Sequence, residues 1–239
     1  MLDALPRTSL GFFPTPIHPL PNLSARLGGP TLWIKRDDQT GLATGGNKTR
    51  KLEFLVADAL QQRADTLITV GAPQSNHARQ TAAAAAKAGL KSALVLRGAP
   101  PADRTGNILL DDLVGAEIFW AGTRSLDEVA AEVAEELTAR GQRPYLIPLG
   151  GSNPIGAAGY AAAMLEFVEQ AKASDLHFDA IVFATSSGGT QSGLMLGAKL
   201  SGYTDRLLGI SVDHPADYLV PLLVELANAT AQHIGATSI

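Results

Sequence analysis

The 239-residue sequence contains no cysteine, which excludes disulfide bonds, cysteine nucleophiles and cysteine-ligated metal sites. Its five histidines are scattered and form no HxH or HExxH pattern, so we expect no bound metal. A run of about 18 apolar residues is also missing, and no membrane span is expected. These absences argue against disulfide-stabilised, metal-dependent and membrane-embedded proteins.

Charge is sparse as well. Charged residues make up 18% of the sequence and the formal net charge is -4, whereas a nucleic-acid binder usually carries a basic patch. The amino terminus lacks the basic start and apolar run of a signal peptide. The hydrophobic fraction of 46% is ordinary for a protein with a buried core. We therefore expect a cytoplasmic globular protein that binds neither nucleic acid nor membranes.

Strand-like and helix-like segments alternate along most of the chain, as judged from apolar periodicity and from glycine and proline breaks. We expect strands at residues 31–38, 65–71, 92–98, 116–122, 143–151, 178–189 and 206–213, and helices at residues 49–60, 76–89, 105–115, 125–141, 156–173, 190–202 and 218–235. The first 30 residues, rich in proline and glycine, are expected to form an extended lead-in over the surface.

This alternation indicates an α/β fold in which helices cover both faces of a parallel sheet. Ligands of such sheets bind outside the carboxyl ends of the strands, where three polar loops of this sequence fall. A fourth loop at residues 148–160 could line a pocket or act as a hinge between lobes, but its signal is weak and a plain turn is the simpler interpretation. The pair Asp37 and Asp38 is more typical of a loop or helix cap than of a catalytic dyad.

The first loop, GLATGGNKTRKL at residues 41–52, places Lys48 at the start of a predicted helix. A P-loop is disfavoured, because Asn47 separates Gly46 from Lys48 and the required glycine is absent at position 42. A lysine in a dry pocket near a helix amino terminus has a lowered amine pKa and can form a Schiff base with a carbonyl. A solvated lysine in the first helical turn explains the loop equally well, so the loop alone leaves the role of Lys48 open.

The second loop places four hydrogen-bonding side chains between a predicted strand and a predicted helix. They are Gln74, Ser75, Asn76 and His77. Together with the free amides of a helix amino terminus they would suit a carboxylate. Capping of the helix by Ser75 or Asn76 is the simpler interpretation, and it accounts for one of the four.

The third loop, TSSGGTQSG at residues 185–193, also joins a predicted strand to a predicted helix. Its glycines permit close backbone approach and its hydroxyl groups are donors, so it can hold a phosphate without a lysine. The loop lacks the GxGxxG pattern, which disfavours a dinucleotide. A plain glycine-rich turn is the alternative.

The three loops together offer a lysine, a carboxylate site and a phosphate site at strand ends of one architecture. The ligand that they imply has a phosphate and a carbonyl, and its partner has a carboxylate. Pyridoxal phosphate (PLP) with an amino acid meets that description.

The sequence resembles the D-cysteine desulfhydrase and 1-aminocyclopropane-1-carboxylate (ACC) deaminase family in three stretches: KRDDQTGLATGGNKTRKLEFLVADAL, ADTLITVGAPQSNHARQTAAAAAKAGL and RPYLIPLGGSNPIGAAGY. The resemblance extends from Pro14 onward. Members of this family are PLP enzymes of fold type II, more distantly related to the tryptophan synthase β-subunit.

The resemblance implies a role for each candidate residue. Lys48 would be the Schiff-base lysine and, with Ser75, a catalytic residue, and Asn47 would lie at the cofactor. Asn76 would hydrogen-bond the phenolic oxygen O3′ of PLP. The substrate would contact Gln74, Ser75, Asn76 and His77, and the phosphate would be bound by Ser187, Gly188, Gly189 and Thr190.

The family fold implies two lobes of parallel sheet with flanking helices. We expect a larger PLP-binding lobe from residues 1–48 and 156–239, and a smaller α/β lobe from residues 49–155. Members of the family run further at the carboxyl end, so we expect the larger lobe to be incomplete. A homodimer is expected from the same resemblance.

The activity that the resemblance implies is α,β-elimination of D-cysteine to pyruvate, sulfide and ammonia. His77 favours this activity, because the ACC deaminases compared carry a glutamine there. L-cysteate sulfo-lyase and ACC deaminase activity are the alternatives. A non-catalytic truncated remnant of the same fold is an alternative of another class.

Overall fold

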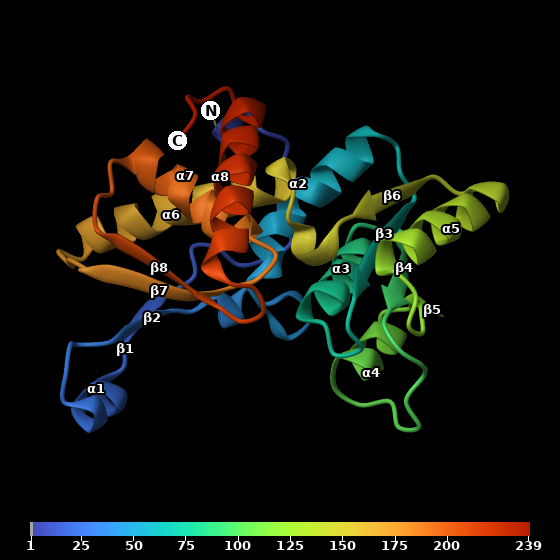
Figure 1. The fold of residues 1–239 in the computed structure, drawn as a ribbon, viewed down its shortest axis with the longest axis horizontal. Helices are drawn as coiled ribbons and strands as arrows, with labels where there is room; N and C mark the ends of the chain where they lie inside the picture. Colours follow the sequence, from blue (N-terminus) through green and yellow to red (C-terminus); the bar gives the residue numbers. More distant parts are fainter. Residues whose placement is uncertain (1) are drawn as a thin grey trace.

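A computed structural model describes residues 2–239, and Figure 1 shows two neighbouring groups of strands and helices. The first group is built on a four-stranded parallel sheet in the order β5-β4-β3-β6. Its strands are β3 (Thr66–Gly71), β4 (Lys91–Leu96), β5 (Glu117–Trp120) and β6 (Pro144–Ile147). Its helices are α3 (Asn76–Lys87), α4 (Gly106–Leu113) and α5 (Leu126–Ala139).

Helices cover both faces of this sheet. Successive side chains of a strand point to opposite faces, so the contacts of two neighbouring residues show what covers each face. Leu67 of β3 packs in a core cluster with Leu55 of α2 (Lys48–Gln61) and with α3. Its neighbour Ile68 packs with Val133 of α5 on the other face. The α/β fold predicted from the alternation is therefore confirmed.

The second group contains three long helices and a pair of parallel strands. The helices are α6 (Pro154–Ala173), α7 (Gly189–Ser201) and α8 (Ala216–His233), and the strands are β7 (Ala180–Thr185) and β8 (Arg206–Ser211). One face of the strand pair packs on α6 and α7 through Ile181, Phe183 and Leu207. The apolar side chains Val182 and Ile210 of the other face are exposed.

The amino-terminal region differs from the extended lead-in that the sequence predicted. It contains β1 (Ile17–Pro19) and a short helix α1 (Pro21–Leu27), and β1 pairs antiparallel with β2 (Trp33–Lys35). Proline suits the first helical position, where no amide hydrogen is needed, and Gly28 ends α1 in a left-handed conformation. The predicted strand at residues 31–38 is shortened, because Asp37 begins a 3-10 helix.

Helix α2 lies between the two groups and contacts both α3 and α6 (Figure 1). The four-stranded sheet falls within residues 49–155, and α6 to α8 fall almost entirely within residues 156–239. Because α2 contacts both groups, the lobe boundaries at residues 48/49 and 155/156 stay a prediction.

The sequence predicts neither a membrane span nor a metal site. None of the helices between residues 2 and 239 combines the length and the hydropathy of a membrane span. In the same range there is no group of three histidine or acidic side chains arranged to hold a metal ion.

Candidate active site

One cavity of about 660 Å³ brings together two of the three predicted loops. Lys48 and Asn47 line it from the start of α2. The residues Ser187, Gly188 and Thr190 line it from the turn between β7 and α7. The cavity therefore has a lysine on one side and a glycine-rich helix amino terminus on another.

Two glycines position Lys48 as the first residue of α2. Gly45 and Gly46 have φ values of 77° and 138°, which only glycine adopts readily. A Cβ atom on Gly45 would lie 1.9 Å from the carbonyl oxygen of Asp38, and one on Gly46 would lie 2.4 Å from Nε2 of Gln80. Larger residues are thus excluded from this turn on two independent grounds.

The Lys48 amine is half-buried and forms no ion pair with any described residue. Its Nζ atom has one polar neighbour, Oδ1 of Asn47 at 3.4 Å. Burial lowers the pKa of Lys48 below its ordinary value. A larger fraction of the amine is therefore neutral, which is the form that attacks carbonyls and accepts protons.

Helix α3 holds the lysine loop in place. Oε1 of Gln80 accepts hydrogen bonds from the backbone nitrogen and the hydroxyl of Thr49, both at 2.9 Å. The guanidinium of Arg79 donates to the carbonyl oxygen of Gly45 at 3.1 Å. These bonds tie the residues next to Lys48 to the helix that begins with the second predicted loop.

The turn before α7 is the loop in which the sequence predicts a phosphate site. Gly188 has a φ of 82° and caps α7, whose first backbone amides point toward the helix amino terminus. The hydroxyl of Ser152 accepts from the Gly189 nitrogen at 3.2 Å and lies 2.8 Å from Oγ of Ser187. Free amides and hydroxyls at a helix amino terminus make an anion site.

Lys51 belongs to this site although the sequence analysis did not select it. Its side chain is 1% exposed, and Nζ donates to the carbonyl oxygen of Gly150 at 3.0 Å and to Oγ of Ser152 at 3.3 Å. Burial, together with the charge of Lys48, holds the pKa of Lys51 well below its ordinary value. No acidic side chain of the described residues pairs with it, and its two polar neighbours are uncharged oxygen atoms.

The sequence contains features that could have identified Lys51 and Ser152 as site residues. Lys51 follows Lys48 by three positions, a spacing that puts two side chains on one face of a helix. Ser152 lies in the loop that was interpreted as a plain turn. A Cβ atom on Gly189 would lie 2.7 Å from Oγ of Ser152 and 2.8 Å from Nζ of Lys51. Any side chain at position 189 would therefore clash with the Lys51 amine.

The second predicted loop begins α3 but does not line the 660 Å³ cavity. Ser75 is the N-cap residue of α3, and its Oγ atom accepts from the Ala78 nitrogen at 3.1 Å. The hydroxyl hydrogen of Ser75 is free to donate, because the cap uses only the oxygen. The predicted contacts of Ser75 and its neighbours with a substrate stay a prediction.

The imidazole of His77 is buried against the sheet. Oγ1 of Thr69 donates to the carbonyl oxygen of Ile147 at 2.8 Å and lies 2.9 Å from Nε2 of His77. Since that hydroxyl has one hydrogen, Nε2 of His77 carries the proton in this bond. Burial, with the charges of Lys48 and Lys51, lowers the pKa of His77 well below its ordinary value. The ring is neutral and faces β3, which leaves only its backbone amide for a substrate.

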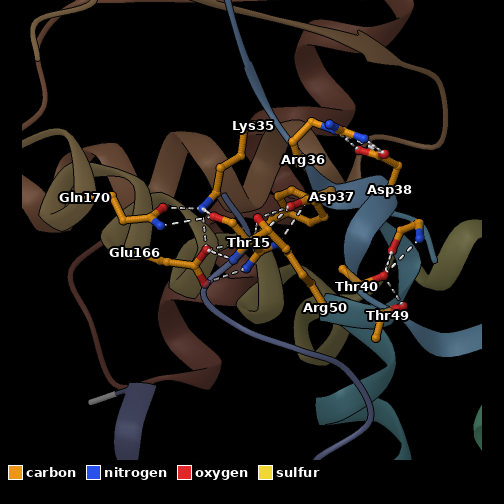
Figure 2. A network of polar contacts seen from close by, with 12 residues as sticks. Thr15, Lys35, Arg36, Asp37, Asp38, Thr40, Thr49, Arg50, Glu166 and Gln170 are labelled. Atoms are coloured by element: carbon orange, nitrogen blue, oxygen red, sulfur yellow. Dashed lines mark hydrogen bonds and ion pairs between the residues drawn. The ribbon is translucent and has the colours of Figure 1, made fainter. Parts of the chain in front are cut away.

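A buried polar network lies beside the cavity, and Figure 2 shows Arg50 at its centre. Arg50 donates to Asp37 at 2.8 and 2.9 Å and to Glu166 at 2.9 Å. The Tyr160 hydroxyl donates to Oδ2 of Asp37 at 2.6 Å. Burial alone would raise the pKa of Asp37, but Arg50 and Tyr160 hold it below its ordinary value. Asp37 lies at the start of a 3-10 helix, which agrees with the expected loop or cap position, and the structure adds its pairing with Arg50.

A half-buried amine without an ion pair, and a helix amino terminus beside a second, buried amine, define a class of protein. The residues present fit a cofactor that carries an aldehyde and a phosphate, which describes PLP. Residues 8–238 match the family described as pyridoxal-phosphate dependent enzymes, and the chain belongs to that family.

Relatives narrow the comparison within this family. A Pyrococcus furiosus protein, provisionally named as an ACC deaminase, is 44% identical over 238 residues, which are 98% of this chain and 71% of that protein. The D-cysteine desulfhydrase of Yersinia enterocolitica is 42% identical over 243 residues, covering 99% of this chain and 73% of that enzyme.

A solved structure supports the same assignment. The crystal structure of an ACC deaminase homologue superposes with a TM-score of 0.91 at 44% identity, covering all of this chain and 72% of that one. The predicted family, the fold type II architecture and the PLP cofactor are thereby confirmed.

Proposed function

We propose that the protein is a PLP-dependent D-cysteine desulfhydrase. In the reaction, D-cysteine and one water molecule give pyruvate, hydrogen sulfide and ammonia. The Cβ–S bond and the bond from Cα to nitrogen break, and the water oxygen becomes the ketone oxygen of pyruvate. Neither an oxidant nor a reductant is consumed.

The observation that carries this proposal is the placement of two lysines on one face of α2. Nζ of Lys48 lines the cavity and has no counter-ion, while Nζ of Lys51 is buried at the amino terminus of α7. The first lysine suits the aldehyde of PLP and the second suits its phosphate. A P-loop or a simple helix cap would require at most one of these two lysines.

The roles of the chain's own residues follow from this placement. Lys51, Ser187, Gly188 and Thr190 would bind the phosphate, and Lys48 would bind the aldehyde carbon covalently. When bound, PLP supplies an electron sink for the carbanion at Cα. The Lys48 amine, whose pKa is lowered by burial, is the base that we assign to the α-proton. The free amides at the start of α3 would bind the substrate carboxylate.

D-Cysteine is favoured by the relative from Yersinia enterocolitica and by His77 in the second loop. The second candidate is ACC deamination, which the relative from Pyrococcus furiosus supports. L-Cysteate is a third substrate with the same functional groups at Cα. All three reactions need an amine, a carboxylate and a base at Lys48.

A substrate panel separates these candidates. The purified protein would be supplied with PLP and with D-cysteine, L-cysteine, L-cysteate, β-chloro-D-alanine or ACC. D-Cysteine desulfhydrase activity gives pyruvate and sulfide from D-cysteine, whereas ACC deaminase activity gives 2-oxobutyrate from ACC. A protein that binds PLP but turns over none of these would be the non-catalytic member of the fold.

Lys48→Ala is the first variant to test. We expect the visible absorbance band of the PLP-loaded protein, at about 420 nm, to be absent from this variant. Turnover should be lost as well, because the variant lacks both the covalent attachment and the base. Lys91→Ala, at an exposed lysine, is the matched control. An unchanged band in Lys48→Ala would rule out the assignment of this lysine.

The homodimer expected from the family resemblance is part of the same proposal, as is a cytoplasmic location. The partner would be a second copy of the chain, and the substrate a small amino acid. Light scattering of the purified protein, with and without PLP, would give the mass. A mass of one chain under both conditions would contradict the dimer.

A further inference from the structure

The first turn of α4 is bound to the second loop at the start of α3. The two helices lie side by side in the first group (Figure 1). The Gln74 side chain donates from Nε2 to the carbonyl oxygen of Thr105 at 3.1 Å and accepts from the Asn107 nitrogen at 2.8 Å. In return, Nδ2 of Asn107 donates to the carbonyl oxygen of Gln74 at 2.8 Å. Gln74 is therefore held by α4 through both ends of its side-chain amide.

Asn107 also contacts Asn76, and the hydrogen bonds determine the orientation of both amides. A backbone carbonyl can only accept, so the group of Asn107 that faces Gln74 must be its NH2 group. That group lies 3.1 Å from the Asn76 side-chain oxygen and donates to it. The Arg79 guanidinium, which can only donate, lies 3.4 Å from the same oxygen. Because both neighbours donate, the side-chain oxygen of Asn76 must face Asn107 of α4 and Arg79.

The remaining group of Asn76 is its NH2 group. Within residues 2–239 no acceptor bonds to Nδ2 of Asn76, and the side chain is exposed. An amide with its oxygen occupied and its nitrogen free is a donor for a ligand oxygen. If Asn76 turned by 180°, its oxygen would face the ligand and its NH2 group would meet the donors of Asn107 and Arg79.

We propose that Asn107 is a positioning residue that keeps the NH2 group of Asn76 available to the phenolic oxygen O3′ of the cofactor. The inference rests on the proposed function, in which PLP is attached to Lys48, and on the contact between Asn76 and O3′ that the family resemblance implies. Asn107 does not touch the cofactor and acts through Asn76. The same contact connects α4 to the lysine loop, because Arg79 also donates to Gly45, three residues before Lys48.

Gly106 allows α4 to lie close to the loop that contains Gln74. Its φ is 60°, a conformation that favours glycine. A Cβ atom there would lie 2.5 Å from Oε1 of Gln74, so any side chain would push α4 away from the loop. The contact of Asn107 with Asn76 depends on this glycine.

The test uses the absorbance of the PLP-loaded protein as a function of pH. A donor to O3′ stabilises the form that carries full negative charge on this oxygen, so removing the donor raises the pH at which the band at about 420 nm titrates. We expect Asn76→Ala to raise this midpoint by about one pH unit. Asn107→Ala should shift the midpoint in the same direction by a smaller amount.

Asn107→Asp is a sharper variant, because it keeps the size of the side chain and suits the first turn of a helix. Its carboxylate can only accept, so it attracts the NH2 group of Asn76 and turns the amide. We expect a midpoint shift at least as large as that of Asn107→Ala. Leu113→Ala, at a residue of α4 that is 72% exposed, should leave the midpoint unchanged.

The double variant Asn76→Ala/Asn107→Ala tests whether Asn107 acts through Asn76. The double variant should match Asn76→Ala alone, because the second substitution has nothing left to position. Additive shifts, or unchanged midpoints in both Asn107 variants, would overturn the inference. Thermal melting with circular dichroism would show that each variant is folded.

These outcomes are distinct from a failure of the proposed function. If the wild-type protein shows no visible band with PLP, the proposed function falls and this inference falls with it. If the wild type shows the band and Asn76→Ala leaves its midpoint unchanged, only the inference falls. Turnover of D-cysteine is not needed for either conclusion.

Discussion

At the residue scale, Lys51 is a buried amine, and we propose that the phosphate of PLP binds to it. We expect Lys51→Met to weaken PLP binding by about 10- to 100-fold, the range for losing a charge-assisted hydrogen bond. Binding of pyridoxal, which lacks the phosphate, should change little. Titration of the visible band with each compound measures both affinities. Equal losses for the two compounds would show that Lys51 does not bind the phosphate.

The same substitution also has a predicted effect on stability. Lys51→Met removes a buried amine that has no acidic partner among the described residues, and methionine fills most of the same volume. The melting temperature without PLP should therefore stay equal or rise. A large fall would indicate that the lysine is needed for folding. Lys91→Met, at an exposed position, is the control.

Asp111 is a second unusual residue, because both of its carboxylate oxygens are buried without a hydrogen-bond partner. Burial raises the pKa of Asp111 to about 7, although the charge of Arg79 opposes the change. The folded protein thus binds this proton more tightly than the unfolded chain, in which the pKa is near 3.8. The contribution of Asp111 to stability is present at low pH and is lost as the pH rises through about 7.

We therefore expect Asp111→Asn to have a higher melting temperature than the wild type at pH 8, with the difference shrinking toward pH 5. Thermal melting across this range measures it. Asp103→Asn, at an exposed carboxylate, is the control and should show no such trend. A constant difference across the pH range would contradict the raised pKa of Asp111.

At the element scale, α6 and α7 pack closely because glycines of α7 face the backbone of α6. A Cβ atom on Gly193 would lie 2.3 Å from the carbonyl oxygen of Ala157 and 2.6 Å from Cβ of Tyr160. Backbone cannot move aside cheaply, so Gly193→Ala should lower the free energy of unfolding by roughly 1–3 kcal/mol. Urea denaturation would measure it. Gly29→Ala, which meets no neighbour within 4 Å, should change the stability little.

This packing also affects the site, because α7 begins at Gly189, between Lys51 and Ser152. A shift of α7 away from α6 would widen the distance between the helix amino terminus and the buried lysine. Gly193→Ala is therefore expected to weaken PLP binding as well as stability. Gly29→Ala should affect neither.

At the scale of the whole molecule, the network around Arg50 joins three distant parts of the chain. Arg50 of α2 binds Asp37 after β2 and Glu166 of α6 (Figure 2). Burial would raise the pKa of Glu166, but Arg50 and Lys35 hold it below its ordinary value. Both carboxylates are thus charged in the folded protein at neutral pH, and their charges depend on Arg50.

Arg50→Ala leaves these two charges without their main partner. We expect the free energy of unfolding to fall by about 3–5 kcal/mol at pH 7. The loss should become smaller below about pH 4, because Asp37 and Glu166 then take up protons. Arg140→Ala, at an exposed residue paired with Glu117 and Glu136, should change the free energy of unfolding little, because water screens these pairs. Equal losses for the two variants would contradict the central role of Arg50.

The sequence predicted local structure well where the signal is periodic. Alternating strands and helices followed from apolar spacing, because side chains repeat every second residue in a strand and every 3.6 residues in a helix. Ser125 and Glu128 have the spacing of a capping box at the start of α5, and Oγ of Ser125 accepts from the Glu128 nitrogen. The amino-terminal helix α1 was missed, because seven residues with proline and few apolar positions carry little periodic signal.

The sequence by itself also determined which chemical groups each loop carries, since a lysine among glycines and a glycine-rich helix start depend on neighbours in the chain. Only the tertiary structure decided which side chains complete the site. The Lys51 amine lies at the start of α7, Asp37 pairs with Arg50, and Asn107 donates to Asn76. In each pair the partner is distant in sequence or belongs to another element. The physical reason is that burial and hydrogen bonding set the charge state and orientation of a side chain, and both arise only when the chain has folded.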